Sequence, residues 1–338
     1  MWKVIYDDLN GLREVSFEPG TLRKDYVRIK PEFIGVCGSD KNIVFGSRRK
    51  GKEAISLGHE ISGTVLDGEG SDMQGIPLRK GDRVVVFPNY FCGECPDCKA
   101  GHVNACRNKI SIGVTSDGGL SEVFDVPPKF LLKTEELLEM RYAVLIEPVS
   151  VIHRALAKFE DRSRQLIIIG GGSTGTIAYI LADVMHFKNP IILESSSDKV
   201  SLLKSKGFKV IQTDNFKITE ETDMTGPLNV LDTVGRSATV NVWLEMSESC
   251  VSGSRVVITG LDEYEYSIPQ SVLIRKELRL EGSIIYDETD FINSAAIMAK
   301  NFSRFDVLMD YVRSIKDLDK WLIPAMRRND ILKILIKL

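Results

Sequence analysis

The chain has 338 residues, of which 43% are hydrophobic and 27% are charged, a composition typical of a globular protein with room for two domains. Its net charge of −3 provides no broad basic field, which argues against nucleic acid and anionic membranes as partners. The N-terminus lacks a basic flank and an apolar core, and no uncharged apolar run could span a bilayer. We therefore expect a soluble, cytoplasmic protein.

The first ninety residues predict a small all-β barrel. Alternating runs at Met1–Tyr6, Leu12–Phe17 and Asp25–Pro31 are separated by glycine and proline turn signals. Further strand signals lie at Ile61–Leu66 and Arg83–Phe87. Turn residues about every 8–12 positions are typical of small barrels and sandwiches.

Two segments of this region carry residue types that bind zinc. Cys37 opens the segment CGSD, and His59 with Glu60 ends the segment GHE. Thiolate, imidazole and carboxylate are all zinc ligands, and a set of three leaves a position open, as in catalytic sites. The alternative is a buried cysteine, a core histidine and a surface glutamate.

A basic run, RRKGK, covers residues 48–52. The simpler interpretation is a solvated loop. The functional interpretation is a clamp for a phosphorylated or acidic substrate beside the metal site.

Four of the six cysteines follow the pattern C-x₂-C-x₂-C-x₇-C, at Cys92, Cys95, Cys98 and Cys106. Thiolates at this spacing can close a tetrahedral Cys₄ site, so the pattern predicts a structural zinc. An iron–sulfur cluster shares the ligand type, but nothing else in the chain indicates electron transfer. Cys250 stands apart and is expected to be a small buried hydrophobe.

The middle of the chain contains one acidic residue in an apolar setting. Residues 117–130 predict a turn and a strand, and Glu136–Ala143 predicts a helix that ends at Leu145–Pro148. Glu147 lies in this apolar run, and a buried carboxylate without a partner is costly. Its partner could be a metal or, alternatively, a salt bridge at a domain junction.

From residue 165 the pattern changes to alternating strands and helices. The buried strand Gln165–Ile169 runs into the sequence GGGSTG, and apolar residues at helical spacing follow from Ile177 to Phe187. A G-x-G-x-x-G motif between a strand and a helix predicts dinucleotide binding, with the pyrophosphate at the helix N-terminus. The candidate cofactor-binding residues of this loop are Gly170, Gly172, Ser173, Thr174 and Gly175.

Glu194 follows the next strand, Pro190–Leu193, at about the spacing expected of a ribose-binding acid. A carboxylate accepts hydrogen bonds from the ribose hydroxyls and repels a 2′-phosphate, and no arginine lies in Ser195–Ser197. We therefore expect NAD in preference to NADP. Lys199, on the following helix, could reach the ribose or remain solvated.

The alternation continues to the end of the chain and predicts a parallel, doubly wound sheet. Predicted strands are Lys209–Gln212, Leu228–Asp232, Ser254–Thr259 and Leu278–Tyr286. Predicted helices are Ser237–Ser247, Phe291–Lys300 and Phe305–Ile315. The tail, Asp330–Leu338, is expected to be a strand that returns to the first domain.

Taken in order, the CGSD and GHE segments, the four cysteines, Glu147-Pro148 and the glycine loop resemble the zinc-dependent medium-chain dehydrogenase/reductase family of alcohol and polyol dehydrogenases. The resemblance covers essentially the whole chain. It implies an α/β protein with a GroES-like β-barrel catalytic domain at 1–148 and 286–338, including a zinc lobe at about 90–108. A Rossmann NAD-binding domain would occupy 149–285.

The resemblance also implies roles for single residues. Cys37 and His59 would bind a catalytic zinc, and Glu60 and Glu147 compete for the third ligand place. Ser39 would contact the substrate hydroxyl and begin proton removal. The four cysteines would bind a structural zinc, giving two zinc ions per chain, and the family forms dimers or tetramers.

Within the family, Glu147 is typical of the polyol and sugar branch, and the chain is similar to sorbitol, galactitol-phosphate and archaeal-type glucose dehydrogenases. Asn42 departs from the histidine that often relays the proton, so the proton must leave by another route. Ile152 and Arg154 replace a common glycine and histidine, which makes a structural role more natural for His153.

Three other functions compete with that of a polyol or sugar dehydrogenase. The first is a simple alcohol dehydrogenase with an apolar pocket. The second is a non-catalytic nucleotide-binding protein on the same fold, which would be expected to lose Cys37, Ser39 and His59. The third is a zinc protein that binds nucleic acid, which the acidic balance disfavours.

Overall fold

The computed structural model describes residues 1–46, 54–134, 137–213, 226–261 and 265–338. Its chain divides into two compact units, one formed by Met1–Ser150 with Tyr286–Leu338 and the other by Val151–Ile285. The predicted basic loop at 48–52 and the predicted helix start at Glu136 lie outside the described residues. None of the helices in the described part of the chain has the length and apolar character that a bilayer crossing requires.

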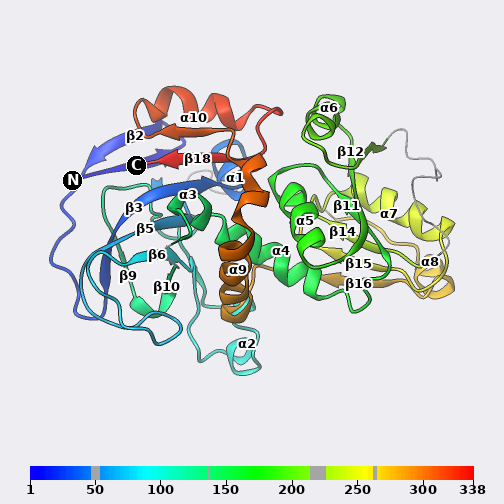
Figure 1. Ribbon diagram of the computed structural model, residues 1–338, viewed down its shortest axis with the longest axis horizontal. Coiled ribbons are helices and arrows are strands. Elements are labelled where there is room, and N and C mark those ends of the chain that lie inside the picture. The colour runs from blue at the N-terminus through cyan, green and yellow to red at the C-terminus, as the bar shows by residue number, and fades with distance from the viewer. Residues whose placement is uncertain (47–53, 135–136, 214–225, 262–264) are drawn as a thin grey trace. The chain divides into compact units, whose positions relative to one another are not determined.

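β-Sheets form the framework of the first unit (Figure 1). One sheet has the order β2-β1-β4, a larger one has the order β10-β6-β5-β3-β18-β17 with β9 also paired to β3, and β7 pairs with β8. The strands are β1 (Trp2–Asp7), β2 (Gly11–Ser16), β3 (Val27–Val36), β4 (Ile55–Ser56), β5 (Glu60–Asp67), β6 (Arg83–Val86), β7 (Asn89–Tyr90), β8 (Ile110–Ser111), β9 (Phe124–Val126), β10 (Leu131–Lys133), β17 (Val312–Ser314) and β18 (Ile334–Lys337).

The C-terminal strand β18, red in Figure 1, lies between β3 and β17 in the larger sheet. It runs antiparallel to β3 and parallel to β17, with Leu335 opposite Gly35. Leu335 and Ile336 are fully buried, whereas Lys337 is exposed. The prediction that the tail returns as a strand to the first domain is confirmed.

The helical segments of the first unit depart from the predictions at several places. They are α1 (Gly38–Phe45), α2 (Pro96–Lys99), η1 (Val103–Ala105), η2 (Pro128–Phe130), α3 (Met140–Ala143), α9 (Glu288–Asn301), η4 (Phe302–Leu308) and α10 (Leu318–Met326). The predicted helix Phe305–Ile315 is wrong, because a 3₁₀ helix ends at Leu308 and β17 follows. The run mixes helical and strand preferences, and pairing with β18 decides its second half.

The predicted helix end at Leu145–Pro148 is also wrong, because α4 (Ile146–Ala157) begins there and continues across the boundary between the units. Pro148 is tolerated in the first turn, where a backbone N–H would have no intrahelical partner. Glu147 lies in the same turn. A carboxylate is favoured there by the positive end of the helix dipole.

The second unit contains a six-stranded parallel sheet in the order β13-β12-β11-β14-β15-β16. This is the strand order of the Rossmann fold, so the predicted doubly wound sheet is confirmed. Its strands are β11 (Gln165–Ile169), β12 (Lys188–Glu194), β13 (Val210–Gln212), β14 (Asn229–Asp232), β15 (Arg255–Ile258) and β16 (Arg279–Gly282). Its helices after α4 are α5 (Ser173–Val184), α6 (Ser197–Ser205), α7 (Ser237–Ser249) and α8 (Gln270–Arg275).

The core of the second unit follows from its sequence pattern. All five residues of β11 are buried, as expected of a central parallel strand covered on both faces. On α7, the fully buried Trp243 packs in one cluster with Ile167 and Val230 from the sheet. Cys250 is buried in the same cluster, as predicted. The last predicted strand, Leu278–Tyr286, is shorter than expected because β16 ends at Gly282.

We predict that Leu335→Ala lowers the free energy of unfolding by about 2–5 kcal/mol, because it leaves a cavity beside β3 in the larger sheet. The matched control is Lys337→Ala on the same strand, whose exposed side chain should change the stability by less than about 0.5 kcal/mol. Urea unfolding of both variants measures this. Equal midpoints for the two variants would contradict the inserted position of β18.

Candidate functional site

Cys37 is held at the junction between β3 and α1. It is the N-cap residue of α1, directly after the last residue of β3. Its backbone N–H donates to Asp40 Oδ2 at 2.8 Å, and the Asp40 side chain thereby closes a capping box. The start of the helix therefore fixes the backbone from which the Cys37 thiol projects.

The pairing of β3 with β5 brings the second segment to Cys37. Glu60 begins β5 opposite Gly35 of β3, and Gly58 adopts a left-handed conformation with φ of 91° just before His59. As a result, one ligand atom each from Cys37, His59 and Glu60 lie within 4.8 Å of one another. The structure thus brings together three of the four residues considered for a reactive zinc, and these three could hold one ion.

Two polar residues of α1 flank the His59 ring. Ser39 Oγ lies 3.4 Å from Nε2, and Asp40 Oδ1 lies 3.7 Å from Nδ1. A carboxylate beside the second ring nitrogen is the usual orienting partner of a metal-binding histidine. Burial alone would lower the pKa of His59, but the charges of Asp40 and Cys37 outweigh it and raise this pKa well above its ordinary value. The surroundings of the ring therefore favour positive charge.

A buried ion pair holds Glu60 from its other side. Lys333, just before β18, donates to Glu60 Oε1 at 2.6 Å and to the Val36 carbonyl at 3.1 Å. The side chains of Lys333 and Glu60 are 1% and 0% exposed, so both charges are removed from water. Burial lowers the pKa of Lys333, but the charges of Glu60 and Cys37 raise it by more.

An unpaired buried atom shows whether the group of Cys37, His59 and Glu60 fits a metal ion. Within the described residues, the buried oxygen Oε2 of Glu60 has no hydrogen-bond partner. Unsatisfied buried polar atoms are costly, so such groups call for an explanation. Thiolate, imidazole and a carboxylate oxygen are the donor types that zinc takes. The residues present therefore fit a zinc ion bound by Cys37, His59 and Glu60.

Glu147 lies outside this group of three. It is 5% exposed, and its Oε1 accepts a hydrogen bond of 2.8 Å from the hydroxyl of the fully buried Tyr286. Burial raises the pKa of Glu147 to about 7, and the charges of His59 and Glu60 act on it in opposite directions. Glu147 is thus a second buried carboxylate, which is close enough to be affected by the charges of His59 and Glu60 but is hydrogen-bonded to a tyrosine.

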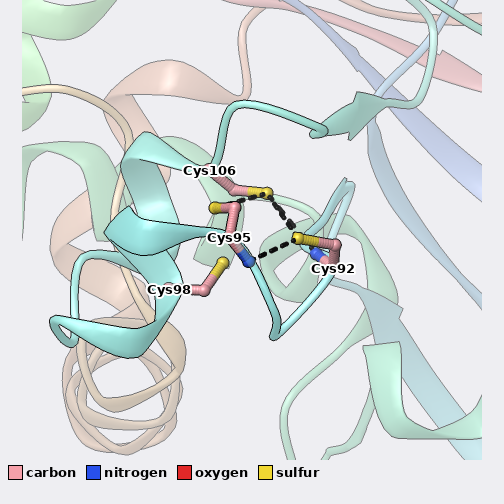
Figure 2. Close-up of side chains that lie close together, drawn as sticks. All are labelled: Cys92, Cys95, Cys98 and Cys106. Atoms are coloured by element: carbon pink, nitrogen blue, oxygen red, sulfur yellow. Dashed lines mark hydrogen bonds between the residues drawn. The ribbon is translucent and has the colours of Figure 1, made fainter.

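The four cysteines converge in a lobe between β7 and β8, as Figure 2 shows. The Sγ atom of Cys106 lies 3.6 Å from Sγ of Cys92 and 3.9 Å from Sγ of Cys95. None of the four cysteines forms a disulfide. Ligand sulfurs of a tetrahedral zinc with bonds of about 2.3 Å lie about 3.8 Å apart. Backbone N–H groups of Glu94 and Cys95 donate to Cys92 Sγ and lower the pKa of this thiol to about 6. The cluster fits a closed Cys₄ zinc site.

The glycine loop joins β11 to α5 in the second unit. Gly170 has φ of 98°, which favours glycine, and Gly172 is the N-cap of α5. A Cβ on Gly175 would lie 1.8 Å from the Gly170 carbonyl oxygen, whereas a Cβ on Gly172 would meet open space. Ser173 and Thr174 form the first turn of α5. The loop therefore packs tightly on one side and leaves the helix N-terminus open, the arrangement that a pyrophosphate requires.

Glu194 ends β12 beside this loop. Its Oε2 accepts from the backbone N–H of Gly171 at 2.8 Å, and its Oε1 accepts from that of Ser196 at 2.9 Å. The carboxylate is thus oriented by main-chain donors. Lys199 is half-buried in the first turn of α6, close in sequence to Glu194.

Several residues of the site have no role in the sequence-based prediction. Asp40 belongs to the CGSD segment, but the sequence-based prediction gives it no role. Its position three residues after an N-cap is a signal for helix capping. Lys333 carried a usable signal, because it interrupts the apolar run Ile331–Ile336 in the same way as Glu147 interrupts its own. Tyr286 gave no signal, since its contact with Glu147 joins residues 139 positions apart.

Comparison with known proteins agrees with these features. The family model for the alcohol dehydrogenase GroES-like domain matches residues 23–136. An uncharacterized zinc-type alcohol dehydrogenase-like protein from Haemophilus influenzae is 29% identical over 86% of this chain and 88% of its own. Galactitol 1-phosphate 5-dehydrogenase from Escherichia coli is 30% identical over 83% of this chain and 82% of its own. A crystal structure of an E. coli alcohol dehydrogenase with NADH matches 100% of this chain and 99% of its own, with a TM-score of 0.88 at 23% identity.

We predict that Gly35→Ala removes one bound zinc per chain and leaves the other. The new Cβ would lie 1.7 Å from Glu60 Oε2, so the carboxylate that faces His59 must move. The matched control is Gly38→Ala, where a Cβ meets nothing within 4 Å. Atomic absorption after gel filtration measures zinc per chain, and full retention in Gly35→Ala would contradict a role for Glu60 in binding.

Proposed function

The chain belongs to the zinc-dependent medium-chain dehydrogenase/reductase family, and from this membership we propose that it oxidises a polyol or sugar by hydride transfer to NAD. The observation that carries the proposal is the convergence of Cys37, His59 and Glu60 within 4.8 Å. The relative that acts on galactitol 1-phosphate supports the polyol class.

We propose Cys37, His59 and Glu60 as the protein ligands of the reactive zinc. Glu60 is preferred to Glu147 because one of its oxygens is unpaired beside the other two donors, whereas Glu147 lies outside the group. Three ligands leave a place for substrate, and zinc bound there supplies Lewis acidity that lowers the pKa of a neighbouring hydroxyl. Cys92, Cys95, Cys98 and Cys106 would hold a second, structural zinc.

The chain's own side chains supply the remaining roles. Ser39, at 3.4 Å from His59 Nε2, is proposed to accept the substrate hydroxyl proton at Oγ as it passes on its own. Asp40 would orient the His59 ring. Glu147, fixed at Oε1 by Tyr286, would orient the substrate hydroxyl through its second oxygen. Asn42, at the position of the histidine that often relays the proton in the family, is exposed.

For the second substrate we propose NAD in preference to NADP. Gly170, Gly172 and Gly175 would admit the pyrophosphate to the N-terminus of α5, with Ser173 and Thr174 in its first turn. Glu194 would accept hydrogen bonds from the ribose hydroxyls and repel a 2′-phosphate. Lys199 is proposed to border the ribose. A homodimer or homotetramer is the family's usual assembly and can be measured by light scattering.

We expect NADH formation from NAD⁺ with members of the polyol, polyol-phosphate or aldose panels, and little with simple alcohols. In Cys37→Ser this activity should fall at least about 1,000-fold while one zinc remains bound to the cysteine lobe. Absorbance at the NADH band and zinc per chain measure these outcomes. Turnover on simple alcohols alone would contradict the polyol class, and silence on every panel with one zinc bound would favour a non-catalytic nucleotide-binding protein.

We expect Glu194→Ala to raise the KM for NAD⁺ by about 10-fold or more, because hydrogen bonds to a charged group are lost, and to raise the ratio of NADP⁺ to NAD⁺ activity. Steady-state kinetics with both dinucleotides measure the change. A matched control is Ser201→Ala on the outer side of α6, whose exposed hydroxyl bonds only within its helix in the described chain. An unchanged cofactor ratio in Glu194→Ala would contradict the assignment.

A further inference from the structure

His59 lies just outside the strand ladder that positions its neighbour. β5 begins at Glu60, and its pairing with β3 ends at Glu60 opposite Gly35. The ladder therefore fixes the backbone of Glu60 but stops one residue short of His59. Another part of the chain must hold the segment at residues 56–58, which joins the end of β4 to His59.

A loop at residues 117–120 holds this segment by its backbone. Three consecutive carbonyl oxygens of the segment accept hydrogen bonds from N–H groups of the loop: Ser56 from Gly118 at 2.8 Å, Leu57 from Leu120 at 3.2 Å, and Gly58 from Gly119 at 2.8 Å. The Gly58 carbonyl belongs to the same planar peptide group as the His59 N–H. The loop thereby orients the peptide from which His59 projects.

The loop and the segment are also in direct contact. A Cβ on Gly118 would lie 2.4 Å from the carbonyl oxygens of both Leu57 and Gly58. On its other side Gly58 faces Ile34, because a Cβ on Gly58 would lie 2.7 Å from Ile34 Cγ2. Close-packed groups transmit displacements to one another. A shift of the loop is therefore passed to the backbone just before His59.

The loop itself is anchored on β1. The Leu120 carbonyl accepts from the backbone N–H of Val4 at 2.9 Å. β1 also pairs with β4, with Ile5 opposite Ser56. One strand thus supports both the loop and the start of the segment that the loop holds.

Asp117 is the side chain that joins these parts. Its Oδ1 accepts from the backbone N–H of Ser56 at 2.9 Å, and its Oδ2 pairs with Lys3 Nζ at 2.8 Å. Ser56 is fully buried, so loss of the acceptor would leave a buried N–H unpaired, which is costly. The side chains of Asp117 and Lys3 are 47% and 28% exposed, and such ion pairs contribute little. The bond to Ser56 is therefore the important one.

We propose that Asp117 is a positioning residue of the reaction site, which acts through the backbone of residues 56–58 on His59. This inference rests on the proposed role of His59 as a zinc ligand. A histidine binds a metal tightly only when its ring is held in place relative to the other ligands. Asp117 contributes to metal affinity through the backbone, without contact with the ion.

The test measures zinc per chain against increasing concentrations of a chelator in Asp117→Ala. Residues that orient a metal ligand typically contribute about 10- to 100-fold to metal affinity. Because Asp117 acts through backbone groups, we expect the zinc affinity of the Cys37 site to fall by about 10-fold. The ion in the cysteine lobe is the internal reference and should be retained as in the wild type.

Two variants separate the oxygens of Asp117. Asp117→Asn keeps an oxygen that can accept from the Ser56 N–H, and Lys3→Met removes only the partner of Oδ2. Both should keep the zinc affinity of the wild type. A wild-type affinity in Asp117→Ala, or an equal loss in Lys3→Met, would overturn the proposal.

The visible spectrum of Co²⁺ exchanged into the Cys37 site gives a readout that needs no turnover. The cobalt bands should shift in Asp117→Ala and match the wild type in Asp117→Asn and Lys3→Met. A merely structural role would lower the free energy of unfolding and leave these bands unchanged.

Activity on the substrate panels separates this proposal from the proposed function. If the wild type binds two zinc ions but is inactive on every panel, the proposed function fails, and a weaker zinc affinity in Asp117→Ala still supports the positioning role. Unchanged affinity and unshifted bands in Asp117→Ala, in an active enzyme, would overturn the positioning role and leave the proposed function intact.

Discussion

The first unit depends on the pairing of three strands at Gly35. This residue lies opposite Glu60 of β5 on one side and opposite Leu335 of β18 on the other. Cys37 follows two residues later, and Lys333 precedes β18. One backbone register therefore delivers a thiol, a carboxylate and an ammonium group to the same place. A shift by one residue would turn each of these side chains to the opposite face.

The ion pair of Lys333 and Glu60 is the energetically demanding part of this arrangement. Taking both charges out of water costs several kcal/mol per ion, and their attraction offsets this only with good geometry and further hydrogen bonds. Lys333 has such a bond to the Val36 carbonyl, and Glu60 is left with one unpaired oxygen. A bound cation would complete the satisfaction of this carboxylate. The pair thus holds Glu60 in place at a stability cost that metal binding would offset.

Features formed by contiguous residues could be predicted from the sequence, whereas features that depend on distant strand pairing could not. The strand β11, the glycine loop and the parallel alternation after it follow from contiguous residues, and the fold class was correct on these grounds. The start of α4 at Ile146 was mispredicted because Pro148 indicates a helix end as readily as a first turn. The region after Phe305 was mispredicted because its pairing partner, β18, lies at the end of the chain.

The reaction site shows the same limit. Cys37, His59, Glu60 and Glu147 could all be named from the sequence, but Glu60 and Glu147 stayed alternatives for the third ligand. The grouping of Glu60 with Cys37 and His59 depends on the register of β3 and β5. Lys333 and Tyr286 reach their partners across 273 and 139 positions, distances over which no periodic pattern carries information.

Both candidate metal clusters lie in the first unit, and the glycine loop with Glu194 lies in the second. No described ligand of either cluster comes from the second unit, and Glu194 is oriented by backbone groups of its own unit. The candidate metal sites and the candidate dinucleotide site are therefore built on separate cores, and we expect that each can be lost separately. Under the proposed function, hydride transfer would require both, because the hydroxyl carbon would be activated in one unit and the acceptor would be held by the other. The reaction is thus the property of the whole chain, although each half of its chemistry is specified locally.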